Sequence, residues 1–251
     1  MKLLDRLHMR HRFWRYRLRS EKQELSFVLR CQLRGATVLD IGANLGIYSF
    51  WLHRAVGVNG SVFAFEPQPE LATHLQDLKS AFRLKNLRIQ EVGLSSRCGE
   101  ADLIRPVHHW GGSSLECCDA REKTERFRIP LKTLDQVFPP GSTRVRFIKC
   151  DVEGHEFSVF RGGIELLQRD KPILLFECPD HLVRERKFFR WLEQIGYQGL
   201  FFAKGHLFAL SEHERIRSQI DRPYLNFVFC GKQDLRTLPM RALCSTVRDA
   251  A

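Results

Sequence analysis

The chain has 251 residues, enough for one large α/β domain or two small ones. Its 43% hydrophobic and 27% charged residues are typical of a folded globular protein and exclude a disordered one. The formal net charge of +11 favours an anionic partner, and no apolar run approaches the ~20 residues that span a bilayer. Because the arginine-rich start also lacks the apolar stretch of a secretory signal, the sequence predicts a cytoplasmic protein.

Residues 1–34 are predicted to form a basic helical segment. Apolar side chains and one histidine repeat there every three or four residues, as on one stripe of a helix: Leu4, Leu7, His11, Trp14 and Leu18. Residues 1–20 also hold seven Lys or Arg against one acid, Asp5. Two roles stay open for this arm. Its stripe could cover the following domain, or it could lie on an anionic membrane surface.

From residue 35 to residue 232, strand and helix patterns alternate. Short, continuously apolar runs predict five strands buried on both faces: 36–41, 60–67, 86–92, 144–151 and 172–178. Helical patterns lie between or after them: 47–56, 69–84, 155–169 and 183–197. This order predicts an α/β domain with a doubly wound, mostly parallel sheet. Three last strands, at 199–203, 206–210 and 226–231, are expected to be antiparallel, and 233–251 forms a tail.

Residues 94–136 interrupt the alternation and are expected to form a hairpin over the top of the sheet. A polar loop, "HHWGGSSLECCD", occupies its middle. His108, His109 and Trp110 could form a lid that touches a substrate, since long loops in compact domains are often functional. A solvated loop is the equal alternative.

Acidic side chains follow the predicted parallel strands. Ligands of open α/β sheets bind beyond the carboxyl ends of the strands, where these acids would gather. They are Asp40, Glu66, Asp151, Glu153, Glu156 and Glu177. Carboxylates are seldom buried without a partner, so this row predicts a ligand with hydroxyls or a cationic group.

Glu66 ends the second strand, 20 residues after Gly46, where a carboxylate can accept both hydroxyls of a ribose. NAD and S-adenosylmethionine both carry such a ribose. The turn "GANLG", from Gly42 to Gly46 with Asn44 in the middle, does not match the G-x-G-x-x-G of a dinucleotide site. Asp40 at its mouth would repel a phosphate and attract the ammonium of a methionine moiety. In the alternative, Asp40 only caps the next helix.

Several segments together resemble the FkbM family of S-adenosylmethionine-dependent methyltransferases. They are "VLDIGANLGIYS", "VFAFEPQPE", "GGSSL", "TLD", "FIKCDVEGHE", "FRGG" and "PILLFE", within about residues 24–230. The resemblance implies a seven-stranded class I methyltransferase fold over 35–232, S-adenosylmethionine as cofactor and O-methylation of a sugar, glycan or secondary metabolite.

The resemblance also implies roles for single residues. Asp40, Gly42, Asn44 and Gly46 would form the loop that holds the methionine part of the cofactor. Glu66 would hold the ribose. The residues of the methyl-transfer end are Asp151, Glu153 and Glu156. His155 stands where the family often has a small residue, and either glutamate or His155 is expected to be the base that deprotonates the acceptor.

Some alternatives remain open from sequence. No metal ligand is assigned, although Asp151 and Glu177 could bind Mg²⁺. The eight cysteines form no C-x-x-C pair and are expected to be reduced. The expected partner is a small-molecule or glycan acceptor and not nucleic acid. An RNA-modifying methyltransferase and a non-catalytic binding module of the same fold are the competing functions, and the oligomeric state is open.

Overall fold

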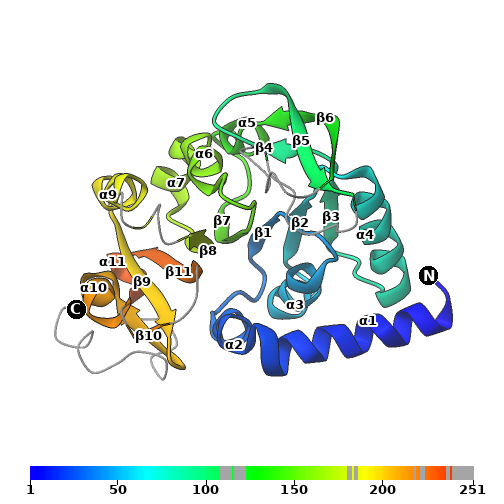
Figure 1. Ribbon diagram of the computed structural model, residues 1–251, viewed down its shortest axis with the longest axis horizontal. Coiled ribbons are helices and arrows are strands. Elements are labelled where there is room, and N and C mark those ends of the chain that lie inside the picture. Colours follow the sequence, from blue (N-terminus) through cyan, green and yellow to red (C-terminus); the bar gives the residue numbers. More distant parts are fainter. Residues whose placement is uncertain are drawn as a thin grey trace.

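The structure is a computed structural model (Figure 1), and it describes residues 1–107, 115, 123–179, 183, 186–217, 219–220, 224–235 and 238. A mixed eight-stranded sheet forms its centre, in the order β10-β9-β11-β8-β7-β1-β2-β3. The strands are β1 (Thr37–Ile41), β2 (Ser61–Phe65), β3 (Leu87–Gln90), β7 (Val145–Cys150), β8 (Ile173–Pro179), β9 (Tyr197–Ala203), β10 (His206–Ala209) and β11 (Tyr224–Gly231).

The five predicted parallel strands are confirmed, and so are the three antiparallel strands that follow. The resemblance implied seven strands, whereas the main sheet has eight, the number given by the apolar runs, because β9 and β10 form a hairpin. Lys204 and Gly205 both have positive φ, 46° and 85°, which is the backbone of a tight two-residue hairpin turn. The extra strand therefore follows from local turn chemistry at the edge of the sheet.

Helices cover both faces of the sheet (Figure 1). One face carries α1 (Leu3–Arg15), α2 (Lys22–Arg30), α3 (Ile47–Val56) and α4 (Pro69–Phe82). The other carries α5 (Leu134–Val137), α6 (Glu156–Arg161), α7 (Ile164–Asp170) and α9 (Lys187–Gln194). Short helices complete the described chain: η1 (Tyr16–Ser20), η2 (Leu210–Glu212), α10 (His213–Arg217) and α11 (Lys232–Leu235). Along β2 and β8, successive side chains point alternately to the hydrophobic cores under these two helical layers.

The helix expected over 155–169 is broken into α6 and α7 at Gly162 and Gly163. A Cβ atom at Gly162 would lie 2.0 Å from the carbonyl oxygen of Ser95, and one at Gly163 would lie 2.8 Å from the side chain of Leu134. The two glycines thus let the backbone of neighbouring segments approach, at the cost of helix continuity.

The N-terminal helix forms as expected, but it packs through a different face. Met9 and Phe13 are buried, and the ring of Phe13 stacks on Phe50 of α3 with centroids 4.0 Å apart. Most of the predicted apolar stripe does not cover the domain, since Leu7 is 52% exposed and Trp14, which meets Trp51 edge-on, is still 53% exposed. No helix in the described parts of the chain is long and apolar enough to cross a membrane.

The hairpin expected within 94–136 is present as part of a second, three-stranded sheet, in the order β4-β6-β5. Its strands are β4 (Gly93–Leu94), β5 (Gly99–Pro106) and β6 (Thr124–Lys132). Figure 1 shows this sheet above the carboxyl ends of the main-sheet strands. The predicted lid residues His108, His109 and Trp110 lie outside the described residues.

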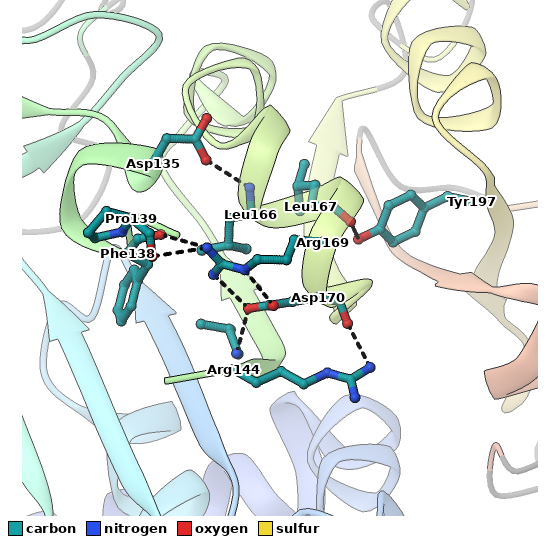
Figure 2. Close-up of polar contacts among 10 residues, drawn as sticks. Asp135, Phe138, Pro139, Arg144, Leu166, Leu167, Arg169, Asp170 and Tyr197 are labelled. Atoms are coloured by element: carbon teal, nitrogen blue, oxygen red, sulfur yellow. Dashed lines mark hydrogen bonds and ion pairs between the residues drawn. The ribbon is translucent and has the colours of Figure 1, made fainter. Parts of the chain in front are cut away.

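A network of hydrogen bonds fixes the amino end of β7 (Figure 2). The guanidinium of Arg169 donates to both carboxylate oxygens of Asp170, at 2.8 and 3.1 Å. The backbone N–H of Val145, at the start of β7, donates to the same carboxylate at 2.8 Å. Asp135 accepts from the backbone N–H of Leu166 at 2.8 Å and so caps the first turn of α7. These hydrogen bonds hold α5, α7 and the start of β7 together.

Candidate active site

A cavity lies at the carboxyl ends of β1, β2 and β7, beneath the second sheet. Apolar side chains form one part of its wall: Phe65, Val92, Leu94, Leu103 and Ile129. Polar residues form the other part: Asn44, Glu66, Gln68, Asp151, Glu153 and His155. The cavity therefore combines an apolar slot with a row of carboxylates.

The turn after β1 brings the backbone close to β7. Gly42 has φ +76°, and a Cβ atom there would lie 1.9 Å from the carbonyl oxygen of Asp151. The backbone N–H groups of Gly42 and Ala43 both donate to the carbonyl of Phe65 at 3.0 Å. Gly46 serves packing, because a Cβ atom there would lie 2.6 Å from the side chain of Leu78 in α4. The "GANLG" turn thus needs its glycines for close approach.

Glu66 is buried at the floor of this cavity, with 3% of its surface exposed. Its two carboxylate oxygens accept from the backbone N–H groups of Asn44, at 2.8 Å, and Gln68, at 3.1 Å. Burial raises the pKa of Glu66 despite these bonds. A carboxylate has about four acceptor positions, so two remain for the hydroxyls of a ligand.

Asp40 is buried beneath the turn and is not among the residues that line the cavity. It accepts from the hydroxyl of Ser49 at 2.5 Å and also from the backbone N–H of Ser49, in the first turn of α3. Burial raises the pKa of Asp40 to about 6. This geometry fits the alternative in which Asp40 caps the helix, and it sets the carboxylate back from the cavity wall.

Lys149 is a buried cation at the end of β7 that sequence reasoning did not select. Its Nζ lies 3.1 Å from the carboxylate of Asp151, and its side chain is 2% exposed. Burial opposes its charge, but Asp151 and Glu21 outweigh burial and raise the pKa of Lys149 above its ordinary value. The signal in the sequence was a lysine inside the apolar run "FIKC", where a charge is kept only with a partner.

Of the three remaining predicted residues, all in the loop after β7 or at the start of α6, two line the cavity and one does not. Glu153 and His155 line the cavity, and His155 Nε2 lies 3.0 Å from the hydroxyl of Ser95. Glu156 is 2% exposed and accepts from the backbone N–H groups of Val152, at 2.9 Å, and Gly154, at 3.3 Å. Burial raises the pKa of Glu156 to about 7. Glu156 therefore holds its own loop and is absent from the cavity wall.

A second cavity opens beside the first, at the carboxyl end of β8. Residues from the N-terminal arm and from β8, β9 and β11 line it: Ser20, Glu21, Gln23, Glu24, Glu177, Phe202, Ala203, Lys204, Gln219, Ile220, Tyr224, Leu225 and Asn226. Glu177 stands one residue beyond the register pair Cys150↔Phe176 of β7 and β8, and so beside Asp151. The two cavities thus flank the same pair of strand ends.

Glu177 differs from the other acids of this region. Among the described residues, no hydrogen bond or ion pair of its carboxylate is found. Burial raises its pKa to about 8, and the negative charge of Asp151 adds to the shift. Its cross-strand neighbour Asn226 donates to Glu24 of α2 at 3.2 Å, which fixes the arm against β11.

The described residues contain no group of three His, Cys, Asp or Glu side chains placed to hold a metal ion. Asp151, which sequence reasoning considered as a possible ligand of Mg²⁺ together with Glu177, is paired with Lys149.

Comparison with known proteins agrees with this geometry. The sequence matches the FkbM methyltransferase domain over residues 40–226. It is 27% identical over 160 residues to the hexuronic acid methyltransferase AglP of Haloferax volcanii, covering 62% of each chain. It is 29% identical over 154 residues to methyltransferase sdnD of Sordaria araneosa, covering 50% of this chain and 59% of that protein. The alignments thus span about three-fifths of these relatives.

A solved structure has a similar fold. The FkbM methyltransferase of Methylobacillus flagellatus KT superposes with a TM-score of 0.50 at 16% identity. The superposition covers 78% of this chain and 44% of that chain.

Proposed function

Because the chain belongs to the FkbM methyltransferase family, we propose that it transfers a methyl group from S-adenosylmethionine to a hydroxyl of a sugar, glycan or secondary metabolite. The observation that carries the choice of a hydroxyl is Glu177. It is a carboxylate without a hydrogen-bond partner among the described residues, beside Asp151 and in the wall of a cavity next to the cofactor cavity.

The residues present fit S-adenosylmethionine, the cofactor expected of the family. The apolar slot between Phe65, Leu94 and Leu103 suits the face of an adenine ring. Glu66 keeps acceptor positions for ribose hydroxyls, and the anionic Asp151 lies where a positively charged sulfonium would be attracted. When bound, the cofactor supplies an electrophilic methyl group.

The acceptor must lose a proton as its oxygen attacks. An alcohol is a weak nucleophile, so a base within hydrogen-bond reach accelerates the transfer. We assign this role to Glu177 in its ionised form, which takes the hydroxyl proton while the new C–O bond forms and the S–C bond breaks; because its pKa is raised to about 8, turnover should rise with pH up to that value. The products are the methyl ether and neutral S-adenosylhomocysteine, and the proton stays on Glu177 until it is released to water.

Lys149 partly neutralises the negative charge of Asp151 at the carboxyl end of β7. An ionised acid beside a sulfonium stabilises the bound cofactor more than the transition state, in which the positive charge disperses. The ion pair of Lys149 with Asp151 reduces this ground-state stabilisation. We therefore propose Lys149 as a positioning residue that acts through Asp151.

The acceptor is proposed to be a neutral, hydroxyl-rich molecule. The relative AglP is named for a hexuronic acid, which carries a carboxylate. The second cavity of this chain instead has Glu21, Glu24 and Glu177 in its wall, and the ionised members of this group would repel an acceptor that carries its own carboxylate. Hydroxyls can donate to these carboxylates, which favours a neutral sugar over a uronic acid.

The test is incubation of the protein with methyl-labelled S-adenosylmethionine and a panel of neutral sugars, uronic acids, RNA and cell extracts. Mass spectrometry then identifies the labelled species. Label on a hydroxyl of a neutral sugar or metabolite supports the proposal. Label on RNA would favour the RNA-modifying function instead, and failure to bind S-adenosylmethionine would favour the non-catalytic binding module.

A further inference from the structure

The outer face of the N-terminal arm exposes an apolar stripe. Of the eight large apolar side chains exposed in the described part of the chain, five lie within residues 3–18. They are Leu3, Leu4, Leu7, Trp14 and Leu18, with exposed fractions of 70%, 78%, 52%, 53% and 58%. Their three-, four- and seven-residue spacing places them along one side of α1 and η1. A contiguous exposed stripe of this kind is typical of an interaction surface.

The stripe cannot turn inward, because the opposite side of the helix is anchored. Phe13 is 1% exposed, stacks on Phe50 and meets Phe82 of α4 edge-on. The indole N–H of Trp51 donates to the carbonyl of Phe13 at 3.4 Å. Figure 1 shows α1 along the rim of the molecule, with α3 between it and the sheet. The arm thus has a protein-facing side and an exposed apolar side, and Trp14 at their border meets Trp51 edge-on while remaining half exposed.

Positive charge surrounds the stripe. Exposed basic side chains accompany it: Lys2, Arg6, Arg10, Arg15 and Arg19. Asp5 is the one acid in this segment. Anionic lipid headgroups complement this charge, and a Trp beside leucines is the side-chain set that enters the headgroup boundary of a bilayer. A second copy of the chain would bring the same cations together, so its charge does not fit.

We propose that α1 and η1 lie in the surface of an anionic lipid bilayer, with the leucines and Trp14 inserted and the arginines on lipid phosphates. The arm continues through Ser20 into Glu21 and Glu24, which line the second cavity. Docking would thus hold that cavity close to the lipid surface. If the second cavity binds the acceptor, this position would suit an acceptor carried by a lipid. That consequence rests on the proposed function, whereas the docking of the arm does not.

Vesicle binding tests the apolar stripe. The full chain is sedimented with phosphatidylcholine vesicles that contain or lack phosphatidylglycerol. A Leu7→Ser/Trp14→Ser variant should bind at least about tenfold more weakly, because two apolar side chains no longer leave water. The matched control is Val58→Ser, which removes a 93% exposed apolar side chain outside the arm. It should bind like the unchanged protein.

The charge requirement is tested with Arg6→Gln/Arg10→Gln against Arg97→Gln/Arg126→Gln, which removes the same charge from exposed sites elsewhere. Each arginine near the lipid should contribute about fivefold, from ~1 kcal/mol per basic residue, and added salt should weaken binding. Absent vesicle binding, or equal binding by the stripe variant, would overturn the proposal. So would stripe-dependent dimerisation, measured by light scattering, without vesicle binding. None of these measurements depends on methyl transfer, so their outcome is independent of the proposed function.

Discussion

Carboxylates lie at both ends of the neighbouring strands β7 and β8, but in different surroundings. At the amino end, Asp170 receives Arg169 and the backbone of Val145, so both of its oxygens have partners (Figure 2). At the carboxyl end, Glu177 has no such partner among the described residues, and burial raises its pKa to about 8. A satisfied buried acid stabilises a fold, whereas an unsatisfied one is retained at a cost and indicates a site.

The same contrast separates the acids of the carboxyl end from one another. Asp40 and Glu156 accept hydrogen bonds from their own surroundings, which places them closer to the structural case. Asp151 is paired with Lys149 and still lines the cavity. Glu66 is intermediate, because its backbone bonds fix it and leave acceptor positions open. Four measurements can break or sharpen this division.

The largest effect is expected at Glu177. A Glu177→Gln variant should lose about 10²- to 10⁴-fold in turnover of a confirmed acceptor, the usual contribution of a general base. Its affinity for S-adenosylmethionine should be kept. The variant Asp102→Asn changes an exposed acid and should keep turnover. Wild-type turnover by Glu177→Gln would remove Glu177 from the chemistry and leave Glu153 and His155 as candidates.

The second effect is expected at Asp170, and on stability. An Asp170→Ala variant leaves Arg169 and the backbone of Val145 without their acceptor, so the free energy of unfolding should fall by about 3 kcal/mol. Urea denaturation measures the change. Turnover of the folded variant should be nearly unchanged. Lost turnover at unchanged stability would show that the division between the two ends is wrong.

The third effect is on cofactor affinity. A Glu66→Ala variant should bind S-adenosylmethionine more weakly by about 1–3 kcal/mol, the cost of removing one partner of a buried polar contact. Calorimetry measures it, with Glu193→Ala as the control at an exposed glutamate. Unchanged affinity in a folded Glu66→Ala protein would contradict the assignment of the ribose to Glu66.

The smallest effect concerns pH and stability. The pKa of Glu177 is raised from 4.5 to about 8 by burial and by Asp151, so the folded protein keeps a proton that the unfolded chain releases. The free energy of unfolding should therefore decline as pH rises through this window. Glu177→Gln should flatten the decline and be relatively more stable above pH 8. An identical slope in variant and wild type would show that the carboxylate is solvated.

Local patterns were enough to predict much of this molecule. The alternation of apolar strands and amphipathic helices gave the five parallel strands, because both periods are properties of consecutive residues. The position of Glu66 after the second strand also followed, since parallel strands bring their carboxyl ends to one edge. The turn around Gly42 was identified in the same way.

Long-range packing decided what these patterns could not. The buried face of α1 was determined by Phe50 and Phe82, which pack on Phe13 and leave the more regular stripe of Leu7 and Trp14 outside. The break between α6 and α7 depends on a carbonyl of Ser95. Neither contact leaves a period in the sequence.

The site shows this division most clearly. The sequence determined which acids stand at strand ends, but not which of them would be satisfied. That depends on partners from distant segments: Ser49 for Asp40, and backbone N–H groups for Glu156. The wall of the second cavity joins Glu24 to Asn226, 202 residues apart. A hydrogen bond requires atoms about 3 Å apart, and only the folded chain brings such groups together.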